Sequence, residues 1–324
     1  MGVNARELVL DILLSLEREE DYSHRLIKAV LDKYDYLEGR EKAFIKRVAE
    51  GTLERGLELD YYLDRFSSLP VGKMRPLIRC LMRMSVYQLL YMDNVPDSAV
   101  CDEACKLAAK RGFERLKGFV NGVLRAISRK KDELPLPDEK TEPVLYDSVK
   151  YSMPRWLVEL WRQEYGQEVA RTILEGLMAI RPVSMRFRLG IPEAERGRLC
   201  ALMREKGMTV EQSPYLPYVY LVGHAEGVEM LPGFREGMCT IQDISSALAV
   251  EAAQIRPEDF VIDVCAAPGG KSLLAAEKAA RGRVLARDLS QDKLARIAEN
   301  IARMRAGNIQ AQVYDATRAD EALL

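Results

Sequence analysis

The sequence predicts a multidomain protein with an all-α helical bundle first, then a small α+β subdomain, then an α/β domain. Apolar residues recur at helical spacing through the first 131 residues. Near residue 183 they alternate as in a strand, and from residue 260 short β-branched runs alternate with helical stretches. With 324 residues, 48% of them hydrophobic, the chain is long enough for two or three packed domains.

Residues 1–131 are predicted to form about seven short helices. Pro70, Pro76 and Pro96 fall between apolar stripes, where proline can end one helix and begin the next. Short helices joined by short connections form a compact bundle. The stripes comprise Leu8, Ile12 and Leu16; Leu26 and Val30; Phe44 and Val48; Leu77, Leu81 and Met84; Val100, Ala104 and Leu107; and Val120, Leu124 and Ile127.

The bundle carries the positive charge of a chain that is nearly neutral overall. Residues 1–131 hold 24 Lys/Arg and 20 Asp/Glu, a net of +4, which leaves 24 and 29, a net of −5, for the remainder. Residues 65–92 contain five basic residues and no acid, and residues 106–131 contain nine with Glu114 as the one acid. Contact with RNA phosphates and a solubilising surface are both open readings. The candidate RNA contacts are Arg75, Arg79, Lys106, Lys110, Arg111 and Lys117.

Residues 132–150 are predicted to be a linker, because prolines stand among charges there without any periodicity. The small α+β subdomain is predicted over residues 151–239. In its first strand Met185 and Phe187 alternate with Arg186, as in a half-buried strand. The predicted elements are two helical stretches to about residue 180, a strand at 183–189, a helix at 192–206 and strands at 208–211 and 218–222.

Three tyrosines in this region and one aspartate just after it are candidates for a functional role. Tyr215, Tyr218 and Tyr220 could stack on bases, but without an RNP-like pattern core and turn roles are favoured. Asp243 is expected to stand at the N-terminus of a helix over residues 244–250 rather than to catalyse.

The α/β domain is predicted to present a ligand edge. A strand at 260–264 leads through small residues into a helix that starts near Ser272, and further strands end at Asp288 and Asp315. Together with Asp263, acids thus stand at the carboxyl ends of three successive strands, which is where an open α/β sheet binds ligands.

Two common nucleotide motifs do not fit the loop at 265–271. A P-loop requires glycine where Cys265 stands, although Gly270-Lys271-Ser272 matches its end. The dinucleotide pattern G-x-G-x-x-G fails because Gly269 and Gly270 are adjacent and are the loop's sole glycines. A nicotinamide-dependent dehydrogenase is therefore disfavoured.

The segment Asp263-Val-Cys-Ala-Ala-Pro-Gly-Gly-Lys-Ser272 resembles the S-adenosyl-L-methionine motif of Sun-type RNA cytosine-C5 methyltransferases. The resemblance implies a Rossmann-like domain and S-adenosylmethionine as cofactor. It also implies that the acid at Asp288 holds the ribose and that the acid at Asp315 lies by the adenine. The implied cofactor-binding residues are Cys265, Ala266, Ala267, Pro268, Gly269, Gly270, Lys271, Asp288 and Asp315.

The remaining regions also resemble parts of this family. Arg40-Glu-Lys-Ala-Phe44, Glu50-Gly-Thr52 and Phe119-Val-Asn-Gly-Val-Leu-Arg125 resemble the antitermination factor NusB, and residues 151–239 match in place an RRM-like subdomain. The bundle implies 16S rRNA as substrate, with tRNA as the alternative. The implied domains are a NusB-like RNA-binding domain at 1–131, the linker at 132–150, the RRM-like subdomain at 151–239 and the amino-terminal part of the methyltransferase domain at 240–324.

The family chemistry requires a cysteine that is absent from its expected context. Such enzymes add a thiolate to cytosine C6 so that C5 can attack the cofactor methyl group. The family's cysteines follow strands beyond Asp315, in Pro-Cys and Thr-Cys contexts that do not occur here. The methyltransferase domain is therefore expected to be incomplete and this chain inactive, with its catalytic residues beyond Leu324. Cys265 is a weak substitute because it matches the family's non-catalytic cysteine.

Composition sets the remaining expectations. Six cysteines without a C-x-x-C pair and only two histidines argue against a metal site and for reduced thiols, most of them buried. No apolar run of membrane length or signal peptide occurs, so a cytoplasmic protein without membrane contact is expected, monomeric at full length. The rival class is a non-catalytic RNA-binding regulator of NusB type, against which the loop and its acids argue.

Overall fold

The computed structural model describes residues 4–18, 23–34, 36–179, 181–225 and 227–320. The chain divides into two compact units, Met1–Ala179 and Ile180–Leu324, which we call unit 1 and unit 2. Among the helices of these described ranges, none has the length and apolar character needed to cross a membrane.

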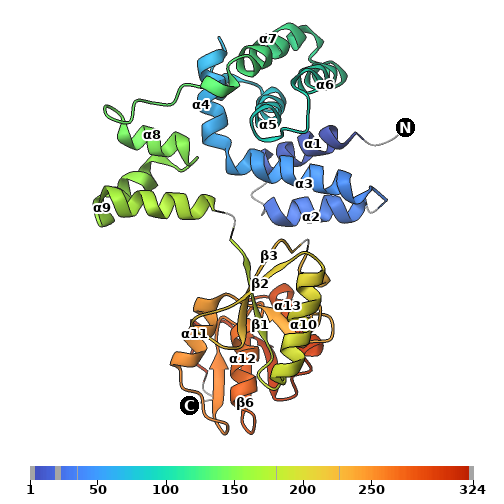
Figure 1. Ribbon diagram of the computed structural model, residues 1–324, viewed down its shortest axis with the longest axis vertical. Helices are drawn as coiled ribbons and strands as arrows, with labels where there is room; N and C mark the ends of the chain where they lie inside the picture. Colours follow the sequence, from blue (N-terminus) through green and yellow to red (C-terminus); the bar gives the residue numbers. More distant parts are fainter. Residues whose placement is uncertain (1–3, 19–22, 35, 180, 226, 321–324) are drawn as a thin grey trace. The chain divides into compact units, whose positions relative to one another are not determined.

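Unit 1 is entirely helical in its described residues, and its first seven α-helices confirm the predicted bundle (Figure 1). The buried stripes of α1, α3 and α5 pack together around Leu10, Ile45 and Leu81. The seven helices are α1 (Ala5–Arg18), α2 (Ser23–Lys33), α3 (Gly39–Glu54), α4 (Gly56–Phe66), α5 (Pro76–Tyr91), α6 (Asp97–Lys110) and α7 (Lys117–Ser128). Short 3-10 turns stand between them at η1 (Val71–Lys73) and η2 (Glu114–Leu116), and η3 (Lys131–Glu133) follows α7.

The linker predicted over residues 132–150 is wrong for its second half. Pro143 begins a helix, α8 (Pro143–Lys150), because proline fits the first helical turn, where its missing N–H costs nothing. Asp147 of α8 is fully buried and receives hydrogen bonds from Arg162 and Arg171 of α9 (Arg155–Met178). These charge-assisted bonds join the two helices, which contact the bundle through α4 and belong to unit 1 rather than to the RRM-like subdomain.

The small sheet of unit 2 is four-stranded and antiparallel, in the order β2-β3-β1-β4. Its elements are β1 (Val183–Phe187), α10 (Glu193–Glu205), β2 (Thr209–Gln212), β3 (Val219–Gly223), η4 (Val228–Met230) and β4 (Cys239–Ile241). Met185 and Phe187 pack against Leu199 and Met203 of α10, which covers one face of the sheet (Figure 1). β4 was not predicted, and it carries the small sheet past the boundary placed at residue 239.

Arg186 corrects the half-buried reading of β1. Its side chain is fully buried, because the second face of the small sheet is covered by the next domain rather than by water. The guanidinium donates to Gln242 at 2.7 Å and to Glu277 at 2.9 Å. An alternating strand pattern marks which residues share a face, and here both faces are buried.

The tyrosines and Asp243 take the places favoured from the sequence. Tyr218 is buried and donates a hydrogen bond to Glu251, and the Tyr220 ring packs edge-on against Phe187 at 5.3 Å between centroids. Tyr215 is exposed in the turn before β3. Asp243 caps α11 (Ile244–Ala252) by accepting from the backbone N–H of Ser245 at 2.8 Å.

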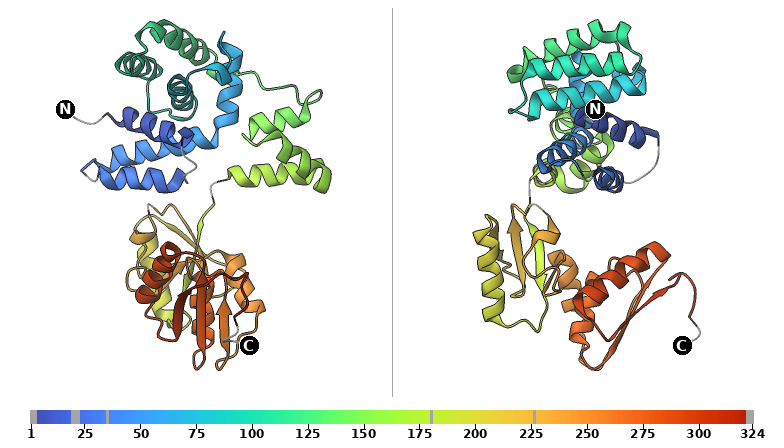
Figure 2. Two further views of the ribbon diagram at one scale, coloured as in Figure 1. Left: turned by 180° about the vertical axis from the view of Figure 1, so that it is seen from behind. Right: turned by 90° about the vertical axis from the view of Figure 1, so that its right-hand side faces the viewer.

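The larger sheet consists of three parallel strands in the order β5-β6-β7, drawn in orange to red in Figure 2. The chain alternates β5 (Phe260–Asp263), α12 (Gly270–Lys278), β6 (Arg283–Asp288), α13 (Gln291–Met304) and β7 (Ile309–Val313), which confirms the predicted α/β pattern. The apolar faces of α12 and α13 pack on the same side of this sheet, around Val284 and Ala286.

On β5, the other face and one edge of the larger sheet are uncovered in the described residues. Phe260, Ile262 and Val264 are 41%, 39% and 48% exposed, and their alternate spacing places them on one face. β5 pairs with β6 alone among the described strands, so its second edge is open. A doubly wound sheet normally has helices on both faces, and α12 and α13 cover one of them.

Candidate functional site

The loop between β5 and α12 is held by hydrogen bonds with two neighbouring segments, the end of β6 and α13. The backbone N–H of Ala266 donates to the carbonyl of Arg287 at 2.9 Å, and the Asn300 side chain of α13 donates to the carbonyl of Pro268 at 3.0 Å. The Ala266 side chain is buried against Ala286 and Ile297. Only a small side chain fits this position, so the loop is held close to the carboxyl end of β6.

The Asp263 carboxylate fixes the start of the loop by accepting two hydrogen bonds. One carboxylate oxygen accepts from the Ser272 hydroxyl at 2.6 Å, and the other accepts from the backbone N–H of Cys265 at 3.3 Å. Ser272 is fully buried, and its role was missed from the sequence. The sequence feature that could have revealed this role is a hydroxyl residue in the first turn of a helix that begins a few residues after a strand ending in an acid.

Two glycines join the loop to α12. Gly269 adopts φ +103°, a conformation that strains residues with a Cβ, and a Cβ there would meet Ile297 at 3.5 Å. Gly270 has an ordinary backbone conformation and begins the helix. The first N–H groups of a helix have no acceptor within that helix, so this end offers donors for an anionic or carbonyl oxygen.

Asp288 stands at the end of β6 and is tied into the loop. Its carboxylate accepts from the backbone N–H groups of Ala267 at 2.9 Å and Leu289 at 2.8 Å, and from the Lys293 ammonium at 2.9 Å. Burial alone would raise the pKa of this carboxyl, but the hydrogen bonds from Lys293 and the two N–H groups lower it below its usual value. A carboxylate has about four acceptor positions, so about one remains for a ligand.

Asp315 lies next to Asp288 at the same edge. The backbone N–H of Tyr314 donates to the carbonyl of Asp288 at 3.0 Å, which brings the ends of β6 and β7 together. The Asp315 carboxylate accepts from the hydroxyl and N–H of Thr317 at 2.7 and 3.0 Å, and these bonds lower its pKa. The three acids predicted at the ligand edge do therefore gather there, with Asp263 directed into its own loop.

The cysteines differ sharply in their surroundings. Cys80, Cys101, Cys200 and Cys239 are buried, Cys105 is half-buried and Cys265 is exposed in the loop. Burial raises the pKa of Cys80 and of Cys239 to about 12, and it also raises the pKa values of Cys101, Cys105 and Cys200. Nucleophilic attack requires a thiolate, which a raised pKa disfavours.

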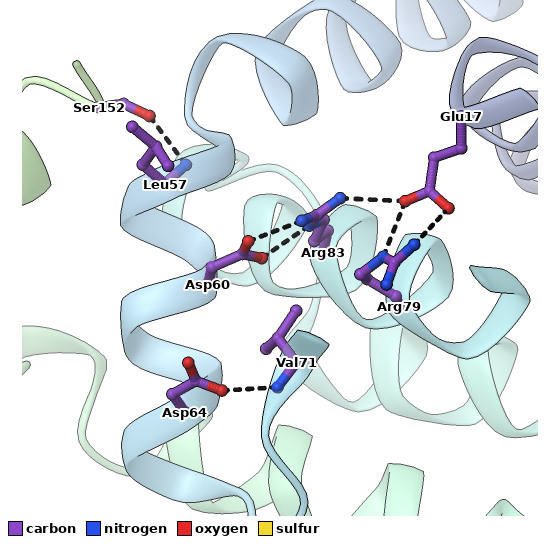
Figure 3. A network of polar contacts seen from close by, with 8 residues as sticks. All are labelled: Glu17, Leu57, Asp60, Asp64, Val71, Arg79, Arg83 and Ser152. Carbon is purple, nitrogen blue, oxygen red and sulfur yellow. Dashed lines mark hydrogen bonds and ion pairs between the residues drawn. The ribbon is translucent and has the colours of Figure 1, made fainter. Parts of the chain in front are cut away.

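Five of the six basic residues singled out in unit 1 form ion pairs with acids, and three of these five pair with acids of α1. Arg79 forms two hydrogen bonds of 2.9 Å with Glu17, which also contacts Arg83 (Figure 3). The other pairs join Lys106 to Glu103, Lys110 to Glu7, Arg111 to Glu7 and Asp11, and Lys117 to Glu114. Arg75 instead lies over the Phe113 ring at 5.8 Å. Of the fourteen basic residues in the two single-sign segments, 65–92 and 106–131, seven thus form ion pairs in the described structure.

Two family models match the chain. One, described as the NusB family, matches residues 3–129, and the other, described as 16S rRNA methyltransferase RsmB/F, matches residues 250–324. Among solved structures, the crystal structure of PH0851 resembles this chain with a TM-score of 0.74 at 20% identity, covering 100% of this chain and 72% of that one. At this identity the likeness concerns the fold alone.

Curated relatives match nearly the whole chain. A protein of Bacillus subtilis named probable ribosomal RNA small subunit methyltransferase B is 33% identical over 98% of this chain and 70% of its own length. A Synechocystis protein with the same name is 30% identical over 97% of this chain and 69% of its own. The chain therefore belongs to the ribosomal RNA small subunit methyltransferase B family, which accounts together for the bundle, the small sheet and the loop next to Asp288.

Proposed function

We propose that the protein transfers a methyl group from S-adenosylmethionine to C5 of a cytosine in 16S rRNA. The main support is the small-residue loop between β5 and α12, held beneath Asp288 at the carboxyl edge of a parallel sheet. When bound, S-adenosylmethionine supplies an electrophilic methyl group. The task left to the chain is to hold the cofactor and the base in reacting positions.

The donors and acceptors of the edge fit this cofactor. Asp288 has an acceptor position left for a ribose hydroxyl, and Asp315 lies beside it for the adenine end. Gly269 and Gly270 have no side chains to cover the backbone where α12 begins. The free N–H groups at this end of the helix can therefore donate to the cofactor's carboxylate. We assign the remaining loop residues Cys265, Ala266, Ala267, Pro268 and Lys271 to the wall of the cofactor site.

We propose further that none of the six cysteines in residues 1–324 is the nucleophile. Burial raises the pKa values of five of them, which disfavours the thiolate, and Cys265 lies within the cofactor loop. RNA containing 5-fluorocytidine tests this directly, because fluorine at C5 blocks release of the covalent thiolate adduct. We expect no adduct with residues 1–324 in the presence of the cofactor. A Cys265 adduct detected by peptide mass spectrometry would contradict the assignment.

The target is testable in cells that carry the gene. We expect 5-methylcytidine at one position of 16S rRNA to be lost when the gene is deleted and restored by the wild-type gene. Nucleoside mass spectrometry of separated 16S rRNA and tRNA measures this. Loss of the modification from tRNA would favour the tRNA alternative, and unchanged methylation of both would favour a non-catalytic RNA-binding regulator.

A further inference from the structure

Unit 1 contains an apolar hollow of about 790 Å³ between α5 and the η2–α7 segment. Its apolar wall includes Met74, Ile78, Phe113 and Phe119. A volume of this size is within the range of about 300–1,000 Å³ that small ligands occupy. The hollow therefore has room for a flat, partly apolar group such as a nucleobase.

Three cations without an ion pair in the described residues gather around this hollow. Lys73, Arg75 and Arg115 line it and are exposed, and none of the three forms an ion pair with any acid in the described part of unit 1. Glu114, the one lining acid, is 80% exposed and pairs with Lys117 at 4.0 Å. The hollow thus joins three available cations to aromatic side chains, which is the combination that binds unpaired nucleic acid.

The backbone that presents these residues is fixed in advance. Asp64 of α4 accepts from the backbone N–H of Val71 at 2.6 Å and so holds η1, which carries Lys73 (Figure 3). On the other side, Gly112 turns the chain at φ +84°, and the N–H of Phe113 donates to the carbonyl of Ala108 at 2.8 Å. Little ordering is left to occur when a ligand enters.

We propose that this hollow binds a single-stranded segment of the substrate RNA. A base lies against Phe113 and Phe119, and the flanking phosphates contact Lys73, Arg75 and Arg115. The positive lining favours a polyanion over an apolar protein segment. This inference rests on the proposed function, since it locates where the RNA substrate docks on unit 1.

Fluorescence anisotropy with a labelled, single-stranded RNA of 12 nucleotides tests the hollow. The triple variant Lys73→Gln, Arg75→Gln, Arg115→Gln should bind at least tenfold more weakly at low salt. Its slope of log affinity against log salt should fall by about 2, since each single-strand phosphate contact contributes about 0.7. Phe113→Leu keeps an apolar side chain but removes the ring, and it should weaken binding by about fivefold or more.

A matched control removes three exposed cations of unit 1 outside the hollow: Lys28→Gln, Arg40→Gln, Lys130→Gln. This triple should keep most of the affinity, and circular dichroism should show that all variants fold alike. Equal losses of RNA affinity in the hollow variant and in the control variant would overturn the proposal. Wild-type affinity in the hollow variant would also overturn it and would mean that the hollow binds another kind of partner. A wild-type protein that binds S-adenosylmethionine but no RNA would instead remove the proposed function and the hollow's role with it.

Discussion

The backbone N–H of Ala267 donates a hydrogen bond of 2.9 Å to the carboxylate of Asp288, which lies 21 residues later in the chain. This bond fixes the loop after β5 against the end of β6. Asp288 itself is 6% exposed at the carboxyl end of β6. Asp288 therefore has two tasks, shaping the loop and accepting from a ligand.

Replacing Asp288 by alanine should weaken S-adenosylmethionine binding by about 1–3 kcal/mol, because the ribose hydroxyl and the Ala267 N–H both lose an acceptor. Titration calorimetry measures the change. Asp292→Ala, an exposed charge in the first turn of α13, is the control and should bind like the wild type. Equal affinity in the Asp288 variant would remove its assignment to the ribose.

Breaking the ion pair between Arg186 and Glu277 should destabilise unit 2 strongly. Arg186→Met leaves Glu277 without its buried partner, and such a loss costs about 3–5 kcal/mol. Both tryptophans, Trp156 and Trp161, lie in unit 1. An unfolding transition that appears in calorimetry but not in tryptophan fluorescence therefore belongs to unit 2.

The control for this pair is the exposed one between Arg281 and Glu258, where Arg281→Gln should cost less than about 1 kcal/mol. Adding Glu277→Gln to Arg186→Met should recover part of the loss, since no unpaired charge then remains. Strictly additive effects of the two substitutions would mean that Arg186 and Glu277 are not energetically coupled.

Two glutamates of unit 1 should respond to pH in opposite ways. Burial would raise the Glu17 pKa, but hydrogen bonds from Arg79 lower it below 4.5, so the stability that Glu17 contributes is present above pH 4.5 and is lost as the pH falls. Burial raises the Glu58 pKa above 4.5 despite the bond from Tyr91, so its contribution is full below pH 4.5 and is lost as the pH rises.

Urea unfolding followed by tryptophan fluorescence should separate the two effects. Glu17→Gln should lower the stability of unit 1 by about 1–3 kcal/mol at pH 7 and by less at pH 4. Relative to the wild type, Glu58→Gln should be more stable at pH 7 than at pH 4. The same pH trend in both variants would contradict the opposite pKa shifts.

The uncovered side of β5 should promote self-association of residues 1–324. Ile262 is 39% exposed on a strand with an open edge, and Ile262→Lys adds a charge that opposes strand pairing. We expect the dissociation constant to rise about tenfold or more in sedimentation experiments. Leu177→Lys on α9 removes an equally apolar exposed residue outside the sheet and should have little effect. A monomeric wild-type chain at high concentration would show that this edge is not adhesive.

Local patterns predicted the elements well, because each helix and strand buries one regular face. The helices of the bundle, α12 and α13 and the three parallel strands all follow from such faces. The loop after β5 was also predictable, because its small residues and Asp263 are adjacent in the chain. α8 was missed because Pro143 belongs equally to a linker and to a first helical turn.

Pairing across distant segments was not predictable from local patterns. Lys110 and Glu7 are 103 residues apart, and nothing near Lys110 in the sequence announces its partner. From the sequence alone Arg186 resembled an outward-facing strand residue. In the fold its buried side chain donates hydrogen bonds to Glu277 and Gln242. Lys73, Arg75 and Arg115 are likewise brought together around the hollow only by the fold, since Lys73 and Arg115 are far apart in the sequence.

Titration of the protein with S-adenosylmethionine, and separately with NAD, tests the assignment of the loop most directly. The loop after β5 lacks the glycine spacing of a dinucleotide site and offers Asp288 and the start of α12 to a nucleoside with a carboxylate. We predict saturable binding of one S-adenosylmethionine per chain and no binding of NAD. Binding of NAD, or a folded protein that binds neither molecule, would contradict the cofactor site and with it the proposed methyl transfer.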